Sequence, residues 1–176
     1  MRTVEFEFIN MNAFIINATV SFLASLVLHE LGHYIAARMC AVPVRRMGLG
    51  WGPKIFGMRV GEVDCEARLL PVGAYVQMDM KALQSRPLVQ QLFVLGAGIG
   101  VNLVLCILTW GSFFSVLNLA LAIGNLIPLY QLDGWKSGMV ICRRIFGRPS
   151  PIVEWVFTLS GGAIAVAVMV KAFLNV

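Results

Sequence analysis

The spacing His29-Glu30-x-x-His33 directly follows a run, residues 13–28, in which nearly every side chain is apolar or small. Residues four apart share one face of a helix, so the two histidines of the chain can point at the same ion. Glu30 is close enough to reach a water molecule beside that ion. Two imidazole ligands and a carboxylate base in this spacing are typical of zinc hydrolases. Because ionisable groups in an apolar segment are energetically costly, we interpret the motif as a metal site rather than a chance match.

The composition excludes an ordinary soluble domain. The 176 residues are 59% hydrophobic and only 13% charged. We therefore predict an α-helical integral membrane protein in which residues 1–176 form a single membrane-embedded domain. The net charge of +5 comes from basic residues spread over loops, so we expect a lipid bilayer as the surroundings and no nucleic acid as a partner. The four cysteines show no metal-binding spacing and are expected to be reduced, and no cleavable signal peptide is expected.

The chain has about four candidate transmembrane helices, since a spanning helix needs about 20 mostly apolar residues. They cover residues 12–39, 88–110, 113–127 and 152–174. The third is short, and Pro128 interrupts it before a half-helix over 135–146. A broken helix at membrane depth must be buried in protein or line a cavity, which makes residues 125–134 a candidate site. Gly96 and Gly100 have the spacing that lets membrane helices pack closely.

Between the first two helices, residues 41–86 are rich in glycine and proline. We predict a small β-hairpin or sheet here, with strands over 55–60, 63–70 and 73–78. The middle segment alternates apolar and charged residues, as a half-buried strand does. Two interpretations remain open for this region. It is either a plain surface hairpin or a sheet at the membrane face whose free edge accepts an extended peptide.

The basic residues also predict an orientation. Nearly all of them fall at or between the ends of the first two helices, or between the third and the fourth, and only Arg2 and Lys171 lie on the opposite side. The excess of positive charge on cytoplasmic loops then places both termini outside and the 41–86 loop in the cytoplasm. The histidine motif is near the cytoplasmic end of its helix. We expect a multi-pass protein of the cell membrane whose active site opens toward the cytoplasm.

A catalytic zinc ion takes three protein ligands and keeps a fourth position open. Asp133 is the best-placed third ligand, because it follows the interrupted helix in apolar surroundings. Glu154 is a weaker candidate, since a carboxylate at the start of a helix is already stabilised by the helix dipole. Asn125 has a side-chain amide that can donate to a carbonyl oxygen or hold a peptide backbone. Alternatively, it caps the helix before Pro128.

These motifs together resemble a known family. The stretches His29-Glu30-Leu31-Gly32-His33, Asn125-Leu126-Ile127-Pro128 and Leu132-Asp133-Gly134 are similar to those of the site-2 protease family, the intramembrane zinc metalloproteases of the peptidase M50 type. Two more stretches are similar to elements of this family: Pro71-Val72-Gly73-Ala74-Tyr75-Val76 and Gly98-Ile99-Gly100-Val101-Asn102. In the first an alanine replaces a glycine, and in the second an isoleucine replaces a proline.

The resemblance implies roles for single residues. His29, His33 and Asp133 would bind one catalytic Zn²⁺, Glu30 would be the general base, and Asn125 would contact the substrate or the oxyanion. The residues that we assign to substrate binding on the same basis are Asn102, Pro71, Gly73 and Tyr75. At Gln131 and at Trp135-Lys136 the chain departs from the family, which often has proline and Gly-Arg at these places.

The function predicted from these features is that of an intramembrane zinc metalloendopeptidase. It would cleave peptide bonds in or near the transmembrane segments of membrane-anchored substrates, in regulated intramembrane proteolysis or in the processing of remnant signal or pheromone peptides. The expected partners are such a substrate and the lipid bilayer, and no oligomeric state is predicted. Two alternatives stay open. One is a relative without proteolytic activity that binds helices or metal, and the other is a structural membrane subunit in which the motif is coincidental.

Overall fold

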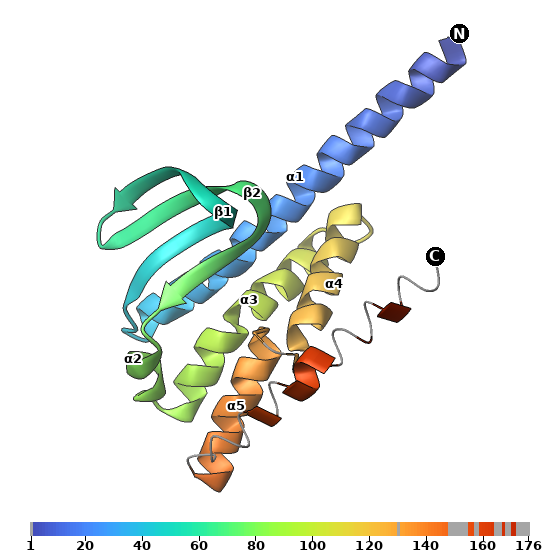
Figure 1. Cartoon of the computed structure of the whole chain (residues 1–176). Coiled ribbons are helices and arrows are strands. Elements are labelled where there is room, and N and C mark those ends of the chain that lie inside the picture. The colour runs from blue at the N-terminus through green and yellow to red at the C-terminus, as the bar shows by residue number, and fades with distance from the viewer. Residues whose placement is uncertain are drawn as a thin grey trace.

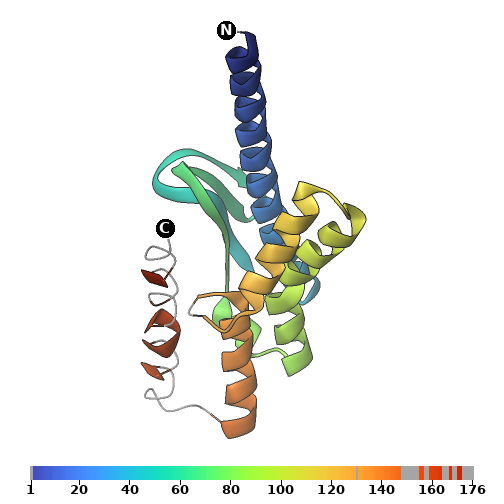
Figure 2. The same ribbon diagram turned by 90° about the vertical axis from the view of Figure 1, so that its right-hand side faces the viewer.

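The computed structural model describes residues 2–129 and 131–147, together with 155–156, 159–163, 167 and 170–171. Its elements, in chain order, are α1 (Arg2–Met39), β1 (Val44–Val60), β2 (Val63–Met78), α2 (Met80–Gln84), α3 (Leu88–Leu108), α4 (Phe113–Leu126) and α5 (Asp133–Phe146). The long helix α1 lies between the sheet on one side and α3 and α4 on the other (Figure 1). A view turned by 90° shows α5 below α4 and α1 extending past the other elements at its N-terminal end (Figure 2).

Two of the described helices are long and apolar enough to cross a membrane, namely Met11–Met39 within α1 and α3 with its 21 residues. The third predicted span corresponds to α4, which has only 14 residues and ends just before Pro128. The predicted half-helix corresponds to α5, which begins two residues early. The predicted span over 152–174 lies mostly outside the described residues. Four transmembrane helices are therefore not confirmed, whereas the mostly helical fold with a small sheet is.

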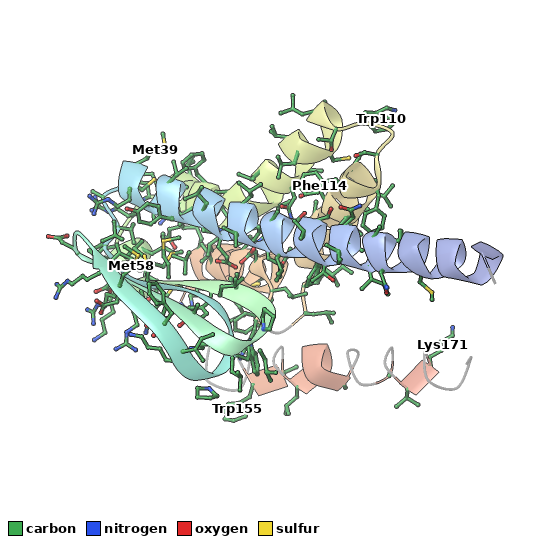
Figure 3. All side chains as sticks on the ribbon, turned by 90° about the horizontal axis from the view of Figure 1, so that it is seen from above. Met39, Met58, Trp110, Phe114, Trp155 and Lys171 are labelled. Carbon is green, nitrogen blue, oxygen red and sulfur yellow. The ribbon has the colours of Figure 1, made fainter. Side chains whose placement is uncertain are left out.

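The outer surface of the helices is apolar. The most apolar 18-residue stretch of α1 is hydrophobic, yet only 6% of it is buried inside the protein. In water such a surface would be unfavourable, and a hydrocarbon environment removes this cost. Seen from above, nitrogen-bearing side chains gather around the sheet near Met58, while the turn at Trp110 carries mainly carbon (Figure 3).

The strands β1 and β2 pair with each other along three separate stretches. Residues 54–60 and 63–68 form an antiparallel hairpin, whose turn places Gly61 at a φ of 60°. The start of β1, residues 44–49, pairs on one side with 74–78 and on the other with 64–67. Within the described residues, 74–78 has a strand partner on one side only. It is therefore an edge of the sheet.

The three predicted strands all lie within β1 and β2, but the first half of β1 was predicted as a loop. Gly50 and Gly52 explain the difference, because they have φ values of 94° and 92° that most residues avoid. They bend β1 so that its two halves lie on opposite sides of residues 64–67 and the first half also pairs with 74–78. The structure also adds the short helix α2, whose first turn is capped by Asp79 through hydrogen bonds from the amides of Lys81 and Ala82.

A buried apolar cluster joins the sheet and the helices at the C-terminal end of α1. Its members are Ala36, Ala37, Cys40, Val42, Val44, Val63, Leu83, Val94, Leu95 and Val140. They come from every described element except α4, so this cluster fixes the sheet and α5 against the helix that carries the histidine motif. The four cysteines of the chain are free, as the sequence suggested.

α1 and α3 approach each other closely at Gly32. A Cβ atom at this position would lie 2.7 Å from Val101 Cγ2 and 3.0 Å from the carbonyl oxygen of Ala97. Gly96 and Gly100, whose spacing suggested close packing, have no described atom within 4 Å of such a Cβ. The packing role predicted for these two glycines is therefore filled by Gly32.

Replacing Gly32 by alanine is expected to destabilise the protein. The new methyl group must displace Val101 or the α3 backbone, and overpacking of this kind costs about 1–3 kcal/mol. Gly96→Ala is the matched control, because it adds the same group to open space and a better helix former. Thermal unfolding in detergent, followed by tryptophan fluorescence, should show a lower Tm for Gly32→Ala alone. Equal Tm values for both variants would contradict the packing described here.

Candidate metal centre

Three buried side chains from two distant segments meet at one point. His29 and His33 lie one turn apart on α1, and Asp133 is the first residue of α5. Asp133 Oδ2 is 3.1 Å from His29 Nε2 and 2.9 Å from His33 Nε2, and the two nitrogens are 3.3 Å apart. Each residue is at most 5% exposed. The structure thus brings together the three ligands suggested by the sequence, and among the described residues only this His/Cys/Asp/Glu group could hold a metal ion.

The geometry of this group fits zinc. Zinc–nitrogen and zinc–oxygen bonds of about 2.0–2.2 Å in a tetrahedral site place neighbouring ligand atoms about 3.3–3.5 Å apart. The observed separations of 2.9–3.3 Å need only a small expansion to match. Two neutral nitrogens and one carboxylate oxygen are also a donor set of catalytic zinc sites, in which a fourth position stays open.

Glycine residues make room for the cluster. A Cβ atom at Gly98 of α3 would lie 2.5 Å from His33 Nε2 and 2.6 Å from His29 Nε2. One at Gly134 would overlap the carbonyl oxygen of Leu126, so the start of α5 can pass the end of α4 only without a side chain there. The sequence indicated a turn at Gly134 but gave Gly98 no role at the site, because its position depends on how α3 packs against α1.

The outer nitrogens of both imidazoles are also held. His33 Nδ1–H donates to the carbonyl oxygen of Val94 at 2.7 Å, which directs Nε2 toward the centre. His29 Nδ1 lies 3.1 Å from the side-chain nitrogen of Asn102. With His29 Nε2 acting as a ligand, Nδ1 carries the proton and needs an acceptor. Rotating the Asn102 amide supplies this acceptor. It also gives a hydrogen bond to the buried Oδ1 of Asn102, which otherwise has no partner among the described residues.

Asn102 is therefore a positioning residue. It is fully buried behind His29 and does not line the cavity beside the cluster, and its assignment to substrate binding stays a prediction. Asp133 is held in a similar way, since Lys136 Nζ donates to its Oδ1 at 3.1 Å. Lys136 is one of the positions at which the chain departs from the family pattern, and no local pattern indicates a role for it at the site.

A cavity of about 580 Å³ opens beside the cluster. Glu30 and Asn125 line it, together with the edge segment of β2. Gly73 and Tyr75 belong to this wall, as their predicted substrate contacts require, but Pro71 is exposed and does not line the cavity. Asn125 does not act as the cap before Pro128, because its Nδ2 donates to the Leu121 carbonyl oxygen at 3.1 Å within α4.

Residues 17–115 match the sequence model of peptidase family M50, which is more than half of the chain. The chain belongs to this family. A Clostridium perfringens protein named "Putative zinc metalloprotease" is 37% identical over 103 residues, which cover 54% of the chain and 31% of that relative. A Neisseria meningitidis protein with the same description is 30% identical over 164 residues, or 80% of the chain and 36% of the relative. The zinc metalloprotease RasP of Geobacillus kaustophilus is 39% identical over 64 residues, or 36% of the chain and 15% of RasP.

Membership of family M50 bears out the resemblance to site-2 proteases, and the names of the relatives imply zinc. The chain spans about a third of the length of the curated relatives that it matches first, with shares of 31%, 29% and 36%. The protein is thus a membrane protein of a zinc metalloprotease family, with a His/His/Asp group able to hold the ion.

Removing a ligand should remove the metal. Asp133→Ala takes away the only oxygen ligand and leaves two nitrogens, so the purified variant is expected to lose its zinc while keeping its helical content. Metal analysis by mass spectrometry, alongside circular dichroism, measures both properties. Equal zinc content in Asp133→Ala and in the unchanged protein, or its absence from both, would rule out this centre.

The positioning role of Asn102 has its own test. Asn102→Ala is expected to weaken zinc binding by about 10- to 100-fold, as loss of a partner of a ligating histidine typically does. The matched control is Asn118→Ala, since Asn118 is equally buried but donates to Ser25 Oγ at 3.0 Å, away from the cluster. Competition with a zinc-chelating dye gives the two affinities. A similar loss in both variants would show that Asn102 acts only through packing.

Proposed function

We propose that the protein is an intramembrane zinc metalloendopeptidase of the site-2 protease type. It cleaves peptide bonds in or near transmembrane segments of membrane-anchored proteins or peptides. The observation that carries this proposal is the convergence of His29, His33 and Asp133 beside a cavity that Glu30 also lines. Regulated intramembrane proteolysis and the processing of remnant signal or pheromone peptides are the two settings that this activity serves.

The chemistry follows from the residues around the cavity. When bound, zinc supplies polarisation of the scissile carbonyl and activation of a water molecule. Glu30, next to His29 in sequence and on the cavity wall, takes the proton of the attacking water and returns one to the leaving amine. The apolar helices around the site keep bulk water away, which strengthens these electrostatic interactions.

Asn125 is assigned to the substrate. Its amide reaches the cavity from α4 and currently donates to the carbonyl oxygen of Leu121. Turning the amide away from that helix bond would let it donate to the developing oxyanion or to the substrate backbone. The carbonyl that it leaves keeps its place in the ordinary helix hydrogen-bond pattern, so the cost of this exchange is small.

The substrate must lose its helical structure before cleavage, because a transmembrane helix hides its amides in internal hydrogen bonds. Strand addition to the sheet compensates for the broken bonds. The supporting observation is that the edge segment 74–78 has an unpaired side and lines the cavity at the metal centre. The segment 64–67, by contrast, lies inside the sheet with strand partners on both sides.

The orientation in the membrane is also part of the proposal. Charged side chains gather at the sheet end of the molecule, near Met58 (Figure 3). Positive charge favours the cytoplasmic side, so both termini lie outside and the cavity opens toward the cytoplasm.

Glu30→Gln is expected to abolish cleavage while zinc stays bound. The amide has the shape of the carboxylate but cannot accept the proton, and loss of a general base costs about 100- to 10,000-fold in rate. The measurement is cleavage of a library of synthetic transmembrane peptides by the purified protein in detergent, read by mass spectrometry. Equal cleavage by both forms would refute this mechanism, and no cleavage by either zinc-loaded form would favour the inactive, helix-binding alternative.

Proline at the sheet edge is expected to slow cleavage. The backbone N–H groups of neighbouring residues in a strand point to opposite sides of that strand. One of the two variants Val76→Pro and Gln77→Pro therefore removes an N–H donor from the unpaired side of 74–78. Control prolines at Arg59 and Val60 do the same at the opposite edge of the sheet, within 54–60, at residues that line neither the cavity at the metal centre nor a second one between α1 and the sheet. We expect kcat/KM to fall at least tenfold in one variant of the first pair only. Equal values in all four variants would contradict strand addition.

A further inference from the structure

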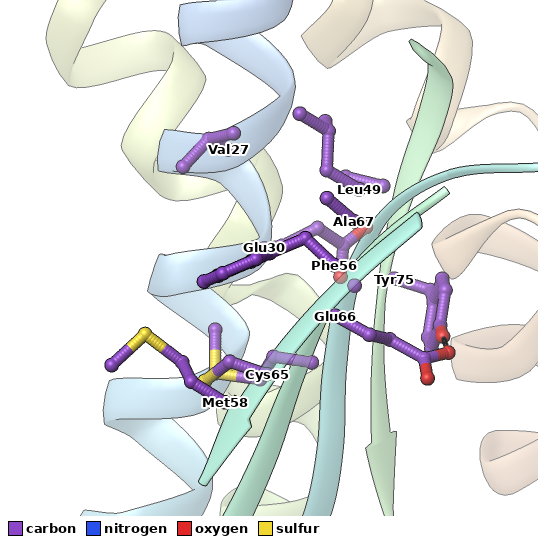
Figure 4. Close-up of a pocket in the computed structure, with 12 residues that line it drawn as sticks. Val27, Glu30, Leu49, Phe56, Met58, Cys65, Glu66, Ala67 and Tyr75 are labelled. Atoms are coloured by element: carbon purple, nitrogen blue, oxygen red, sulfur yellow. Dashed lines mark hydrogen bonds between the residues drawn. The ribbon is translucent and has the colours of Figure 1, made fainter. Parts of the chain in front are cut away.

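A second cavity lies between α1 and the face of the sheet, and its volume is about 210 Å³ (Figure 4). Glu30, Ala74 and Tyr75 line both this pocket and the cavity at the metal centre. The pocket therefore adjoins the cavity at the metal centre, and Glu30 is part of the wall that the two share. Neither the family match nor the chemistry of the metal centre accounts for it.

The lining of the pocket is almost entirely apolar. Val27 contributes from α1, and most of the remaining wall comes from β1, including Met47, Leu49, Phe56 and Met58. An apolar pocket of this kind favours an apolar side chain and penalises a charged one, which would lose its hydration without gaining a partner.

Two acidic residues line the pocket, namely Glu30, to which the base role is assigned, and Glu66, whose charge is compensated. The Tyr75 hydroxyl donates to it, Arg68 Nη2 donates at 2.7 Å, and Lys54 Nζ is 3.9 Å away. The hydrogen bonds from Tyr75 and Arg68 also hold the pKa of Glu66 below its ordinary value. The Glu66 carboxylate is thus occupied within the sheet and offers little to a ligand.

The size of the pocket limits what it can hold. An apolar cavity of roughly 150 Å³ accommodates a benzene molecule. A pocket of about 210 Å³ is therefore large enough for one branched aliphatic or phenyl side chain. One wall is held in place, since the Tyr75 ring is held by Glu66 at its hydroxyl and lies so close to Gly48 that a Cβ there would overlap it.

The geometry points to a substrate subsite: this pocket receives one apolar side chain, leucine or phenylalanine, from a residue next to the scissile bond. The inference rests on the proposed protease function and adds its side-chain preference. Ala67 is the residue that sets the limit. It lies on the sheet wall, in register with Leu49 and Phe56, and a larger side chain there would fill the space (Figure 4).

The test changes the pocket volume in both directions. Ala67→Leu fills the pocket, Met58→Ala enlarges it, and Ala120→Leu makes the same change as the first variant at an exposed position of α4. The probe is a set of synthetic apolar peptides that differ only in having alanine, leucine, phenylalanine or tryptophan next to the bond that the unchanged protein cuts. The readout is the ratio of kcat/KM values within the set.

We expect the unchanged protein and Ala120→Leu to prefer leucine or phenylalanine over alanine by at least about tenfold, since one methylene in an apolar pocket is worth roughly 10- to 200-fold. Ala67→Leu should bring this ratio close to one with little change for the alanine peptide. Met58→Ala should improve the tryptophan peptide. If Ala67→Leu still cleaves and keeps the original preference, the subsite is refuted.

A second readout separates this inference from the proposed function. Glu30→Gln binds peptides without cutting them, so fluorescence anisotropy with labelled members of the set measures the preference without catalysis. A preference for leucine that Ala67→Leu removes from the Glu30→Gln form would support the subsite even if no peptide were cleaved. Binding that ignores the side chain would overturn it, whereas loss of Glu30-dependent cleavage alone would count only against the protease function.

Discussion

The structure depends on the burial of three ionisable side chains at one point of an apolar helical bundle. An unpaired charge or polar group in such surroundings costs several kcal/mol, so the group must be satisfied on every side. The outer atoms are satisfied by protein. His33 uses the Val94 carbonyl oxygen, His29 uses the Asn102 amide, and Asp133 uses the lysine one turn further on. The inner atoms face only one another, and a cation is what two imidazole nitrogens and a carboxylate oxygen can share.

This requirement explains why the elements around the cluster are arranged as they are. α3 must come close to α1 to hold both imidazoles, and Gly98 and Gly32 are the two places where a side chain would prevent it. α5 must begin beside the end of α4, and Gly134 allows this. The broken helix between α4 and α5 is therefore a means of bringing a carboxylate from a late segment to histidines on an early one.

Much of this arrangement could be predicted from local sequence patterns. The apolar runs and Pro128 gave the bounds of α3 and α4 within about two residues, and the motif spacing indicated which side chains could meet. The first half of β1 could not be predicted, because its glycines indicate a loop and its pairing with 74–78 is a long-range contact. The roles of Gly98, Asn102 and Lys136 depend likewise on how helices pack, which no local pattern reports.

The position of Glu30 has a consequence for how chemistry and selection are linked. The carboxylate stands on the wall between the cavity at the metal centre and the apolar pocket under the sheet. A side chain that enters the pocket therefore brings its own backbone past the base, and Tyr75 fixes the wall on the other side. Since the same strand, 74–78, offers its free edge to the substrate, backbone pairing and side-chain burial act on the peptide together. A substrate that cannot fill the pocket is then held less well in the geometry that the reaction needs. Binding of the side chain therefore affects the rate of cleavage as well as the affinity.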